Sequence, residues 1–259
     1  MKIVFVGAGN LATNLCLALN SAGHEVVQVY SRTMDSARAL AQRVGAQATN
    51  DVAKLATNAD IYIIGVTDSA LKEVSSLVVS HIETERGTGN MPLIVHTAGS
   101  IPMDVIGTDR CGVLYPMQTF SRNRIVEFSN IPIFIEANRA EDLDVLQGLS
   151  ASISTSVRVL SSDDRRYLHL AAVFCSNFVN HCYTLTAEIL ERKGIDFSAM
   201  LPLIDEVAAK VHELAPKDAQ TGPARRCDTN VMQAQADLLS YDPRIQEIYR
   251  IMSKSIMHD

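Results

Sequence analysis

The amino-terminal stretch joins a short apolar strand to a glycine-rich turn and then directly to a helix, which restricts the fold more than any other part of the chain. Residues 2–6 form the expected strand, and Gly7 permits the tight turn after it. Gly9 would let a phosphate approach the backbone, and Ala12 leaves room for the helix to pack on the strand. Because backbone N–H groups at a helix N-terminus can receive a pyrophosphate, this G-x-G-x-x-A pattern in its strand–turn–helix context predicts a dinucleotide site. The expected contacts are Gly7, Ala8, Gly9, Asn10 and Leu11.

The end of the next expected strand, residues 25–30, indicates which dinucleotide would bind. In an NAD-specific site a carboxylate near Ser31 would accept a hydrogen bond from the ribose 2′-hydroxyl and would repel a 2′-phosphate. This chain instead has Ser31, Arg32 and Thr33, all donors suited to a phosphate dianion. The pattern therefore predicts NADP(H) as the cofactor. The alternative interpretation is an ordinary turn with a solvent-facing arginine.

Composition excludes several other classes of protein. The chain has 259 residues, of which 47% are hydrophobic and 20% charged, as in an ordinary globular protein. A net charge of −6 leaves no basic field for nucleic acid or a membrane surface, so we expect neither as a partner. The five cysteines are an odd number without a C-x-x-C pair, which favours reduced thiols in the cytoplasm and no metal site. The first apolar run is too short for a signal peptide or a membrane span.

Strands and helices alternate along the first 160 residues. Several of the expected strands are apolar without alternation, as in a parallel sheet covered on both faces. This pattern predicts an N-terminal Rossmann domain with a doubly wound, mostly parallel sheet. The expected strands are residues 2–6, 25–30, 61–65, 93–96, 112–115, 131–136 and 156–160; the expected helices are 10–22, 35–44, 71–81 and 140–150, with a loop at 83–90.

The pattern changes after Leu160 and becomes purely helical. Ser161 to Asp164 provide N-cap residues and early acidic charge for a long helix over residues 165–193, which Gly194 would end. Further helices are expected at residues 200–213, 229–239 and 244–257. We therefore predict an α/β cofactor domain over 1–160 and an all-α domain for substrate binding and dimerisation over 161–259.

A Rossmann half followed by a helical half with a very long first helix resembles the plan of the 6-phosphogluconate dehydrogenase superfamily. Within it the chain resembles pyrroline-5-carboxylate-reductase-like and deazaflavin-type NADP oxidoreductases, and most resembles Rossmann-like proteins whose C-terminal half is a domain of unknown function. Four stretches carry the resemblance, at residues 7–12, 115–121, 169–178 and 221–226. Where relatives commonly have histidine before the Pro-x-Gln-Thr-Phe motif this chain has Tyr115, and where they tend to have Arg-Gly-Asp it has Arg226, Cys227 and Asp228. The resemblance implies an NADP-linked oxidoreductase without naming a substrate, and a dimer formed through the helical domains.

Further site residues should lie where strands end, because ligands of doubly wound sheets bind outside the carboxyl ends of the strands. The segment Val66, Thr67 and Asp68 should line the nicotinamide ribose. Small residues at Thr97, Ala98 and Gly99 would leave space beside the nicotinamide ring. Both segments are also consistent with simple turns. Substrate could be held by Tyr115, Gln118 and Thr119.

Polar residues on the long helix are the expected source of a proton. Asn177 and His181 are four residues apart and share a helix face, while His169 lies two turns earlier. In the resembling dehydrogenases the corresponding helix provides a proton donor and an amide that orients the substrate. We therefore take His169, Asn177 and His181 as catalytic candidates. The alternative is that these side chains satisfy one another, or a second subunit, within a helical bundle.

After the rigid Gly222-Pro223 bend, Arg225 or Arg226 could bind a substrate carboxylate or phosphate, although a solvated arginine pair is the other interpretation. Together these patterns predict an oxidoreductase that transfers a hydride between NADP(H) and a small C=O or C=N substrate between the two domains. Two alternatives stay open: an NADP(H)-binding regulator without turnover, and reduction of a deazaflavin. A homodimer is expected, because long apolar helices in a small domain seldom bury all their surface alone.

Overall fold

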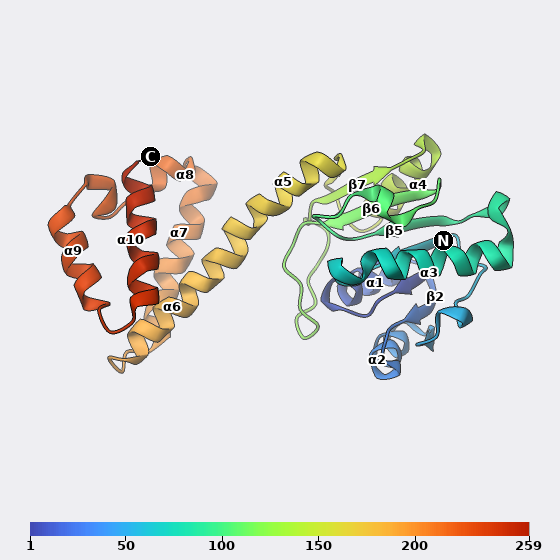
Figure 1. The fold of residues 1–259 in the computed structure, drawn as a ribbon, viewed down its shortest axis with the longest axis horizontal. Helices are drawn as coiled ribbons and strands as arrows, with labels where there is room; N and C mark the ends of the chain where they lie inside the picture. Colours follow the sequence, from blue (N-terminus) through green and yellow to red (C-terminus); the bar gives the residue numbers. More distant parts are fainter. Residues whose placement is uncertain (259) are drawn as a thin grey trace. The chain divides into compact units, whose positions relative to one another are not determined.

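A computed structural model of the protein describes residues 1–258 as two compact units (Figure 1). Contacts within the chain divide it into Met1–Ser176 and Asn177–Asp259. This division falls inside the long helix, whereas our expected boundary near residue 160 follows the last strand.

The first unit contains one sheet of eight strands in the order β3-β2-β1-β4-β5-β6-β7-β8. Neighbouring strands are parallel except β6 and β7, which are antiparallel. The order reverses direction at β1, as in a doubly wound fold, and this confirms the predicted fold class. The strands are β1 (Lys2–Val6), β2 (Glu25–Tyr30), β3 (Gln47–Thr49), β4 (Ile61–Ile64), β5 (Leu93–His96), β6 (Cys111–Pro116), β7 (Ile133–Ala137) and β8 (Val157–Val159).

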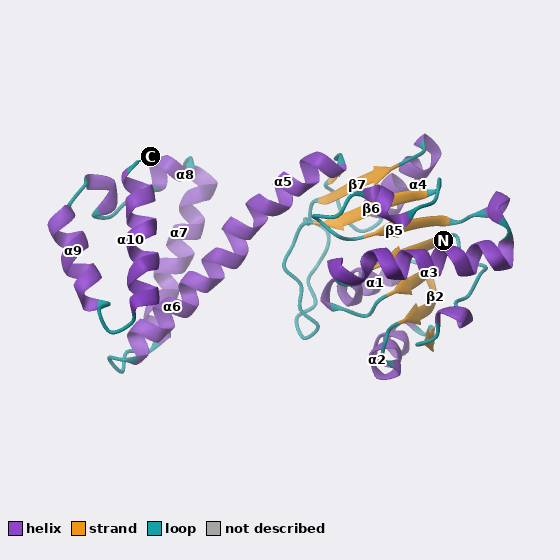
Figure 2. Cartoon of the chain, in the orientation of Figure 1, coloured by secondary structure: helices purple, strands orange, loops and turns teal. Residues whose placement is uncertain are grey.

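Helices cover both faces of this sheet (Figure 2). Alternate residues of β1 point to opposite faces, so Ile3 and Phe5 belong to one buried cluster and Val4 and Val6 to the other. The first cluster includes residues of α1 (Asn10–Ser21), α2 (Met34–Val44) and α4 (Ala140–Ala151), and the second includes residues of α3 (Asp68–Arg86). Short 3-10 turns lie at η1 (Val52–Lys54), η2 (Thr88–Asn90) and η3 (Met103–Ile106).

Two features of this unit differ from the sequence prediction. The three-residue strand β3 was not expected, because its sequence Gln-Ala-Thr has no apolar run. Helix α3 extends beyond the expected residues 71–81 at both ends, and its last turn occupies part of the expected loop 83–90. Glutamate and arginine are good helix formers, so the helix continues to Arg86 and ends only at Gly87, whose φ is +77°.

The long helix begins at Ser162 and is not uniform. It consists of α5 (Ser162–Ala172), a π-helical segment η4 (Val173–Phe178) and α6 (Val179–Glu191). The Ser161 hydroxyl accepts a hydrogen bond from the Asp164 N–H, as expected of an N-cap, and Gly194 has a φ of +66° just past the end. The predicted long helix is therefore present, with a π-helical segment at η4 that the spacing of apolar residues does not reveal.

Among the described residues after Glu191 every regular element is a helix, in agreement with the prediction. They are η5 (Phe197–Met200), α7 (Leu201–Glu213), α8 (Pro216–Ala219), η6 (Ala224–Arg226), α9 (Thr229–Leu238) and α10 (Pro243–Met257). Leu185, Leu239 and Ile245 form a small buried cluster in this unit. Within residues 1–258, no helix combines the length and the hydropathy needed to cross a membrane.

Candidate active site

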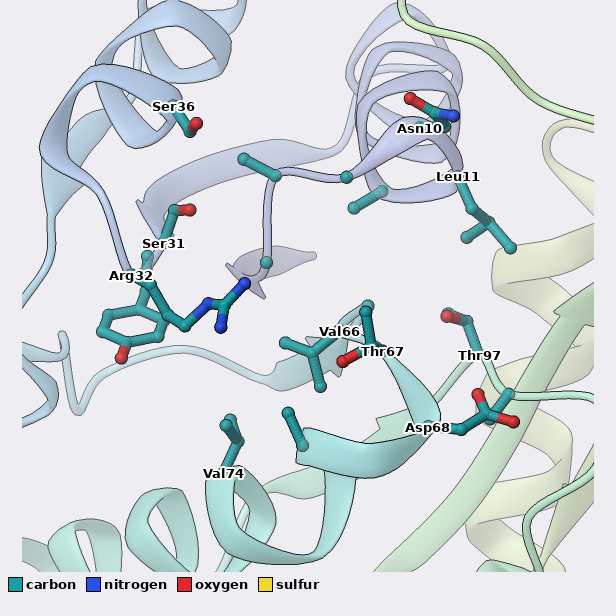
Figure 3. A pocket seen from close by; sticks show the side chains of 18 of the residues that line it. Asn10, Leu11, Ser31, Arg32, Ser36, Val66, Thr67, Asp68, Val74 and Thr97 are labelled. Atoms are coloured by element: carbon teal, nitrogen blue, oxygen red, sulfur yellow. The ribbon is translucent and has the colours of Figure 1, made fainter.

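One cavity of about 660 Å³ lies at the carboxyl ends of the strands of the first unit (Figure 3). Its volume falls in the range of cofactor sites. The segments that line it follow β1, β2, β4, β5 and β6, which is where a doubly wound sheet binds its ligand. His169, from helix α5, lines the same cavity.

The glycine loop after β1 has the backbone shape that a pyrophosphate requires. Gly7 has a φ of +123°, and a Cβ there would lie 2.3 Å from the Gly65 carbonyl oxygen. At Gly9 a Cβ would come no closer than 3.9 Å to any neighbouring atom, so packing within the protein does not require a glycine there. A ligand against the backbone would require it. Gly9 is also the N-cap of α1 and provides no side-chain cap, which leaves the N–H groups of the first helical turn for an anion.

The cavity has a cation at the end of β2. In Figure 3 the Arg32 guanidinium extends from the end of β2 into the cavity, with the Ser31 hydroxyl beside it. Among the described residues that line the cavity, Asp68 is the one carboxylate, and it lies at the opposite end in this view. Among the described residues lining the cavity, none beside Arg32 is a carboxylate that could accept from a ribose 2′-hydroxyl, and the donors there suit a 2′-phosphate.

The opposite end of the cavity contains a tyrosine–histidine pair. The Tyr115 Oη lies 2.9 Å from His169 Nδ1, and the two rings meet edge to face at 6.0 Å. A Cβ at Gly99 would lie 2.5 Å from His169 Nδ1 and 2.9 Å from the Tyr115 ring, so only glycine lets the two side chains meet there. Burial raises the pKa of Tyr115 to about 12, which keeps its phenol protonated at neutral pH.

Buried polar contacts fix the turn after β5 that contains Gly99. His96 is fully buried, accepts a hydrogen bond from the Ala98 N–H at 3.1 Å, and has its Nε2 3.3 Å from the Pro102 carbonyl. Burial and the nearby Arg165 lower the pKa of His96 to about 4, so its ring is neutral. Arg165 is itself buried and donates to Glu136 and to the Ile101 carbonyl. The segment that faces Tyr115 and His169 is therefore held from both sides.

The residues predicted from sequence fall into two groups. The cavity is lined by every residue expected to contact the cofactor, together with Tyr115, Gln118 and His169. Thr119 is exposed and does not line it. Asn177, His181 and Arg226 belong to the second unit, and their roles stay predictions. Arg122 lines the cavity but was missed, because it lies in an irregular loop without a motif.

Comparison with known proteins supports these features. The family model described as "NADP oxidoreductase coenzyme F420-dependent" matches residues 2–86, and the model described as "Domain of unknown function (DUF2520)" matches residues 131–256. The crystal structure of a candidate NADP oxidoreductase from Bacteroides fragilis is 49% identical, with a TM-score of 0.92 over 100% of this chain and 98% of that chain. The chain belongs to this family. It is thus an NADP oxidoreductase family member with a C-terminal DUF2520 domain.

More distant solved structures share the fold of this NADP oxidoreductase family member. An imine reductase from Myxococcus stipitatus, in complex with NADP+, is 17% identical with a TM-score of 0.67 over 100% of this chain and 92% of that chain. A reductive aminase from Aspergillus terreus, in complex with NADPH and ethyl-5-oxohexanoate, is 14% identical with a TM-score of 0.72 over 99% and 92%. A search of curated proteins found no match.

Proposed function

We propose that the protein uses NADP(H) to transfer a hydride to or from a small C=O or C=N substrate. This proposal rests most on the cavity of the first unit, which has the glycine loop and Arg32 at one end and the Tyr115–His169 pair at the other. The glycine loop and the first turn of α1 would hold the pyrophosphate, and Ser31, Arg32 and Thr33 the 2′-phosphate.

The bound cofactor supplies the hydride, and the chain must supply the proton. Tyr115 would donate its phenolic proton to the nitrogen or oxygen of the substrate as the hydride reaches the carbon. His169 would replace that proton from Nδ1 through the 2.9 Å contact and regain one from solvent. The raised pKa of Tyr115 keeps the phenol protonated at neutral pH but makes it a weaker acid, so the role rests on the contact with His169, which can supply a proton to the phenolate as it forms.

The residues around the Tyr115–His169 pair favour a C=N or C=O substrate. The small residues Ala98 and Gly99 line the cavity beside the expected nicotinamide position, and Gly99 lets Tyr115 and His169 approach that position. Asp68 accepts a hydrogen bond from Ser100 at 2.5 Å, and its negative charge would stabilise the positive charge that develops on a C=N nitrogen as that nitrogen takes up the Tyr115 proton. The shared fold of the imine reductase and the reductive aminase agrees with this class of substrate. Gln118, Thr119, Asn177, His181 and Arg226 are further candidates to orient the substrate.

Steady-state NADPH oxidation with a panel of imines, aldehydes and 2-oxo acids tests the proposal. Turnover of at least one class is expected, and tight NADPH binding without turnover of any member would instead identify a regulator. A deazaflavin belongs in the same panel, because the description of the N-terminal family model names coenzyme F420. If only the deazaflavin is turned over, the hydride acceptor is the deazaflavin and not a C=O or C=N substrate.

Arg32→Ala tests the choice of cofactor. Loss of one charge-assisted contact should weaken NADPH binding about 10- to 100-fold and leave NADH binding unchanged. Arg38→Ala, which removes an exposed arginine of α2 outside the cavity, is the matched control. Equal effects of Arg32→Ala on both nucleotides would contradict NADP(H) selectivity.

We also propose a cytoplasmic homodimer. All five cysteines are free in the described structure, which suits a reducing compartment. Apolar side chains of the second unit stand exposed in rows on its helices, and a second copy of this chain would cover them.

A further inference from the structure

We infer that Arg122 is a cofactor residue that binds the pyrophosphate from beside the glycine loop, and this inference rests on the proposed use of a dinucleotide. Arg122 lies in the long irregular loop, residues 117–132, that joins β6 to β7. In Figure 1 this light-green loop extends away from the sheet alongside α1. Neither the strand-end motifs nor the match to the N-terminal family model, which ends at residue 86, includes it.

The position of the Arg122 side chain relative to the glycine loop is specific. Its Nη2 donates a hydrogen bond of 2.6 Å to the carbonyl oxygen of Ala8, the residue between the two glycines. Arginine has five N–H donors in a planar fork, and this bond uses one of them. No ion pair involving Arg122 exists within residues 1–258. The remaining donors and the full charge are therefore available where the pyrophosphate is expected.

The loop is attached firmly enough to keep Arg122 there. Asn14, fully buried on the second turn of α1, donates to the carbonyl of Ser121 at 2.9 Å and accepts from the N–H of Val126 at 3.0 Å. Its amide also donates to Asn10 within α1, and the other two contacts of this side chain tie the loop to the helix that begins at the phosphate site. Phe120 stacks on the buried Phe128 at 5.7 Å and closes the base of the loop.

This arrangement separates two phosphate-binding tasks. Arg32, at the end of β2, would meet only the 2′-phosphate, whereas Arg122 would meet the pyrophosphate common to NADPH and NADH. A guanidinium that bonds both the loop carbonyl and the phosphate oxygens would join the β6–β7 loop to the cofactor. Arg122 is accordingly a determinant of affinity for any dinucleotide and not of the choice between the two.

Binding measurements with three ligands test the inference. Arg122→Ala should raise the dissociation constants of NADPH and NADH by the same factor, about 10- to 100-fold, and leave that of adenosine 2′-monophosphate unchanged. Arg32→Ala should give the opposite pattern, with weaker NADPH and adenosine 2′-monophosphate and unchanged NADH. Arg124→Ala is the matched control, because it removes a second exposed arginine of the same loop that does not line the cavity.

The possible outcomes distinguish this inference from the proposed function. If the wild-type protein binds both dinucleotides and Arg122→Ala binds them equally well, the assignment of Arg122 is wrong and the proposed function stands. If the wild-type protein binds neither, the proposed function fails. A change in adenosine 2′-monophosphate binding with Arg122→Ala would move Arg122 to the 2′-phosphate and overturn the inference.

Asn14→Asp provides a second, independent measurement. The change replaces the amide donor by a carboxylate oxygen that faces the carbonyls of Asn10 and Ser121, so the loop should detach without loss of any group that touches the ligand. Dinucleotide binding should weaken, and the double variant with Arg122→Ala should be no weaker than Arg122→Ala alone. Additive effects in that cycle would show that Asn14 does not act through Arg122.

Discussion

Tyr115 is the residue whose role the structure changes most, from a substrate contact expected from sequence to the proposed proton donor. Its hydroxyl meets His169 at 2.9 Å inside the cavity. Tyr115→Phe keeps the ring and removes only the O–H, so kcat should fall about 100-fold or more while NADPH affinity stays constant. Tyr167→Phe, an exposed position on the same helix as His169, is the control. A kcat within a few-fold of wild type for Tyr115→Phe would exclude the tyrosine as the proton donor.

Cys227 is the one non-glycine residue with positive φ among residues 1–258, at +54°. It ends η6 in the left-handed region, which favours glycine. A Cβ there costs roughly 1 kcal/mol, so Cys227→Gly should raise the free energy of unfolding by about that amount. Cys227→Ala, which keeps the Cβ, should give no such gain. Chemical denaturation of the three proteins measures the difference, and equal gains from both variants would assign the effect to loss of the thiol.

The two arginines of the cavity show what a sequence can predict at this scale. Arg32 directly follows a strand of a recognisable motif, so its position relative to the glycine loop could be predicted from the chain alone. Arg122 reaches the same loop through Asn14, whose partners lie 107 and 112 residues away. Local patterns contain no information about contacts over such distances.

At the scale of the element, the buried His96 at the end of β5 should make the free energy of unfolding depend on pH. The pKa of His96 at the end of β5 is lowered to about 4 by burial, from an ordinary value near 6.5 in the unfolded chain. The unfolded state therefore binds the proton first as pH falls. The contribution of His96 to the free energy of unfolding is therefore constant above about pH 6.5. It decreases as the pH falls from 6.5 to 4, and the loss reaches about 3 kcal/mol at pH 4.

Urea denaturation between pH 7 and pH 4 measures this loss. His96→Asn keeps an acceptor for the Ala98 N–H but cannot take up a proton, so its stability should fall less steeply than that of the wild-type protein. His258→Asn changes an exposed histidine at the end of α10 and should follow the wild-type curve. Identical slopes for wild type and His96→Asn would show that His96 titrates normally in the folded state.

The elements that could be predicted are those whose burial follows from the local spacing of apolar residues in the sequence. The buried strands β1, β4 and β5 and helix α4 lie within a residue or so of their expected bounds. The strand β3 pairs with β2 through only three residues and has no apolar run, so its pairing depends on the neighbouring strand. The antiparallel direction of β7 also could not be derived, because strand direction depends on the path of the loop before it and not on side-chain alternation.

At the scale of the whole molecule, one row of side chains argues for association of two chains. Leu203, Val207, Val211 and Leu214 follow one face of α7 and its end and are 48–58% exposed. Among the described residues of that unit, its buried hydrophobic cluster consists of Leu185, Leu239 and Ile245, so much apolar surface lies outside the cluster. Helices with such a face are normally covered in solution.

Light scattering should therefore give twice the 28.3 kDa mass of the chain. Val207→Asp places a charge within the apolar row and should shift the mass toward that of one chain, because an unpaired buried carboxylate is costly at an interface. Asp205→Lys changes an exposed residue on the opposite face of α7 and should leave the mass at the dimer value. A wild-type mass of one chain would refute the dimer, and a dimer unaffected by Val207→Asp would move the interface away from α7. The glycine loop, Arg32 and Arg122, which we expect to bind the cofactor, all belong to the first unit. A monomeric variant should therefore still bind NADPH, even if it no longer turns over substrate.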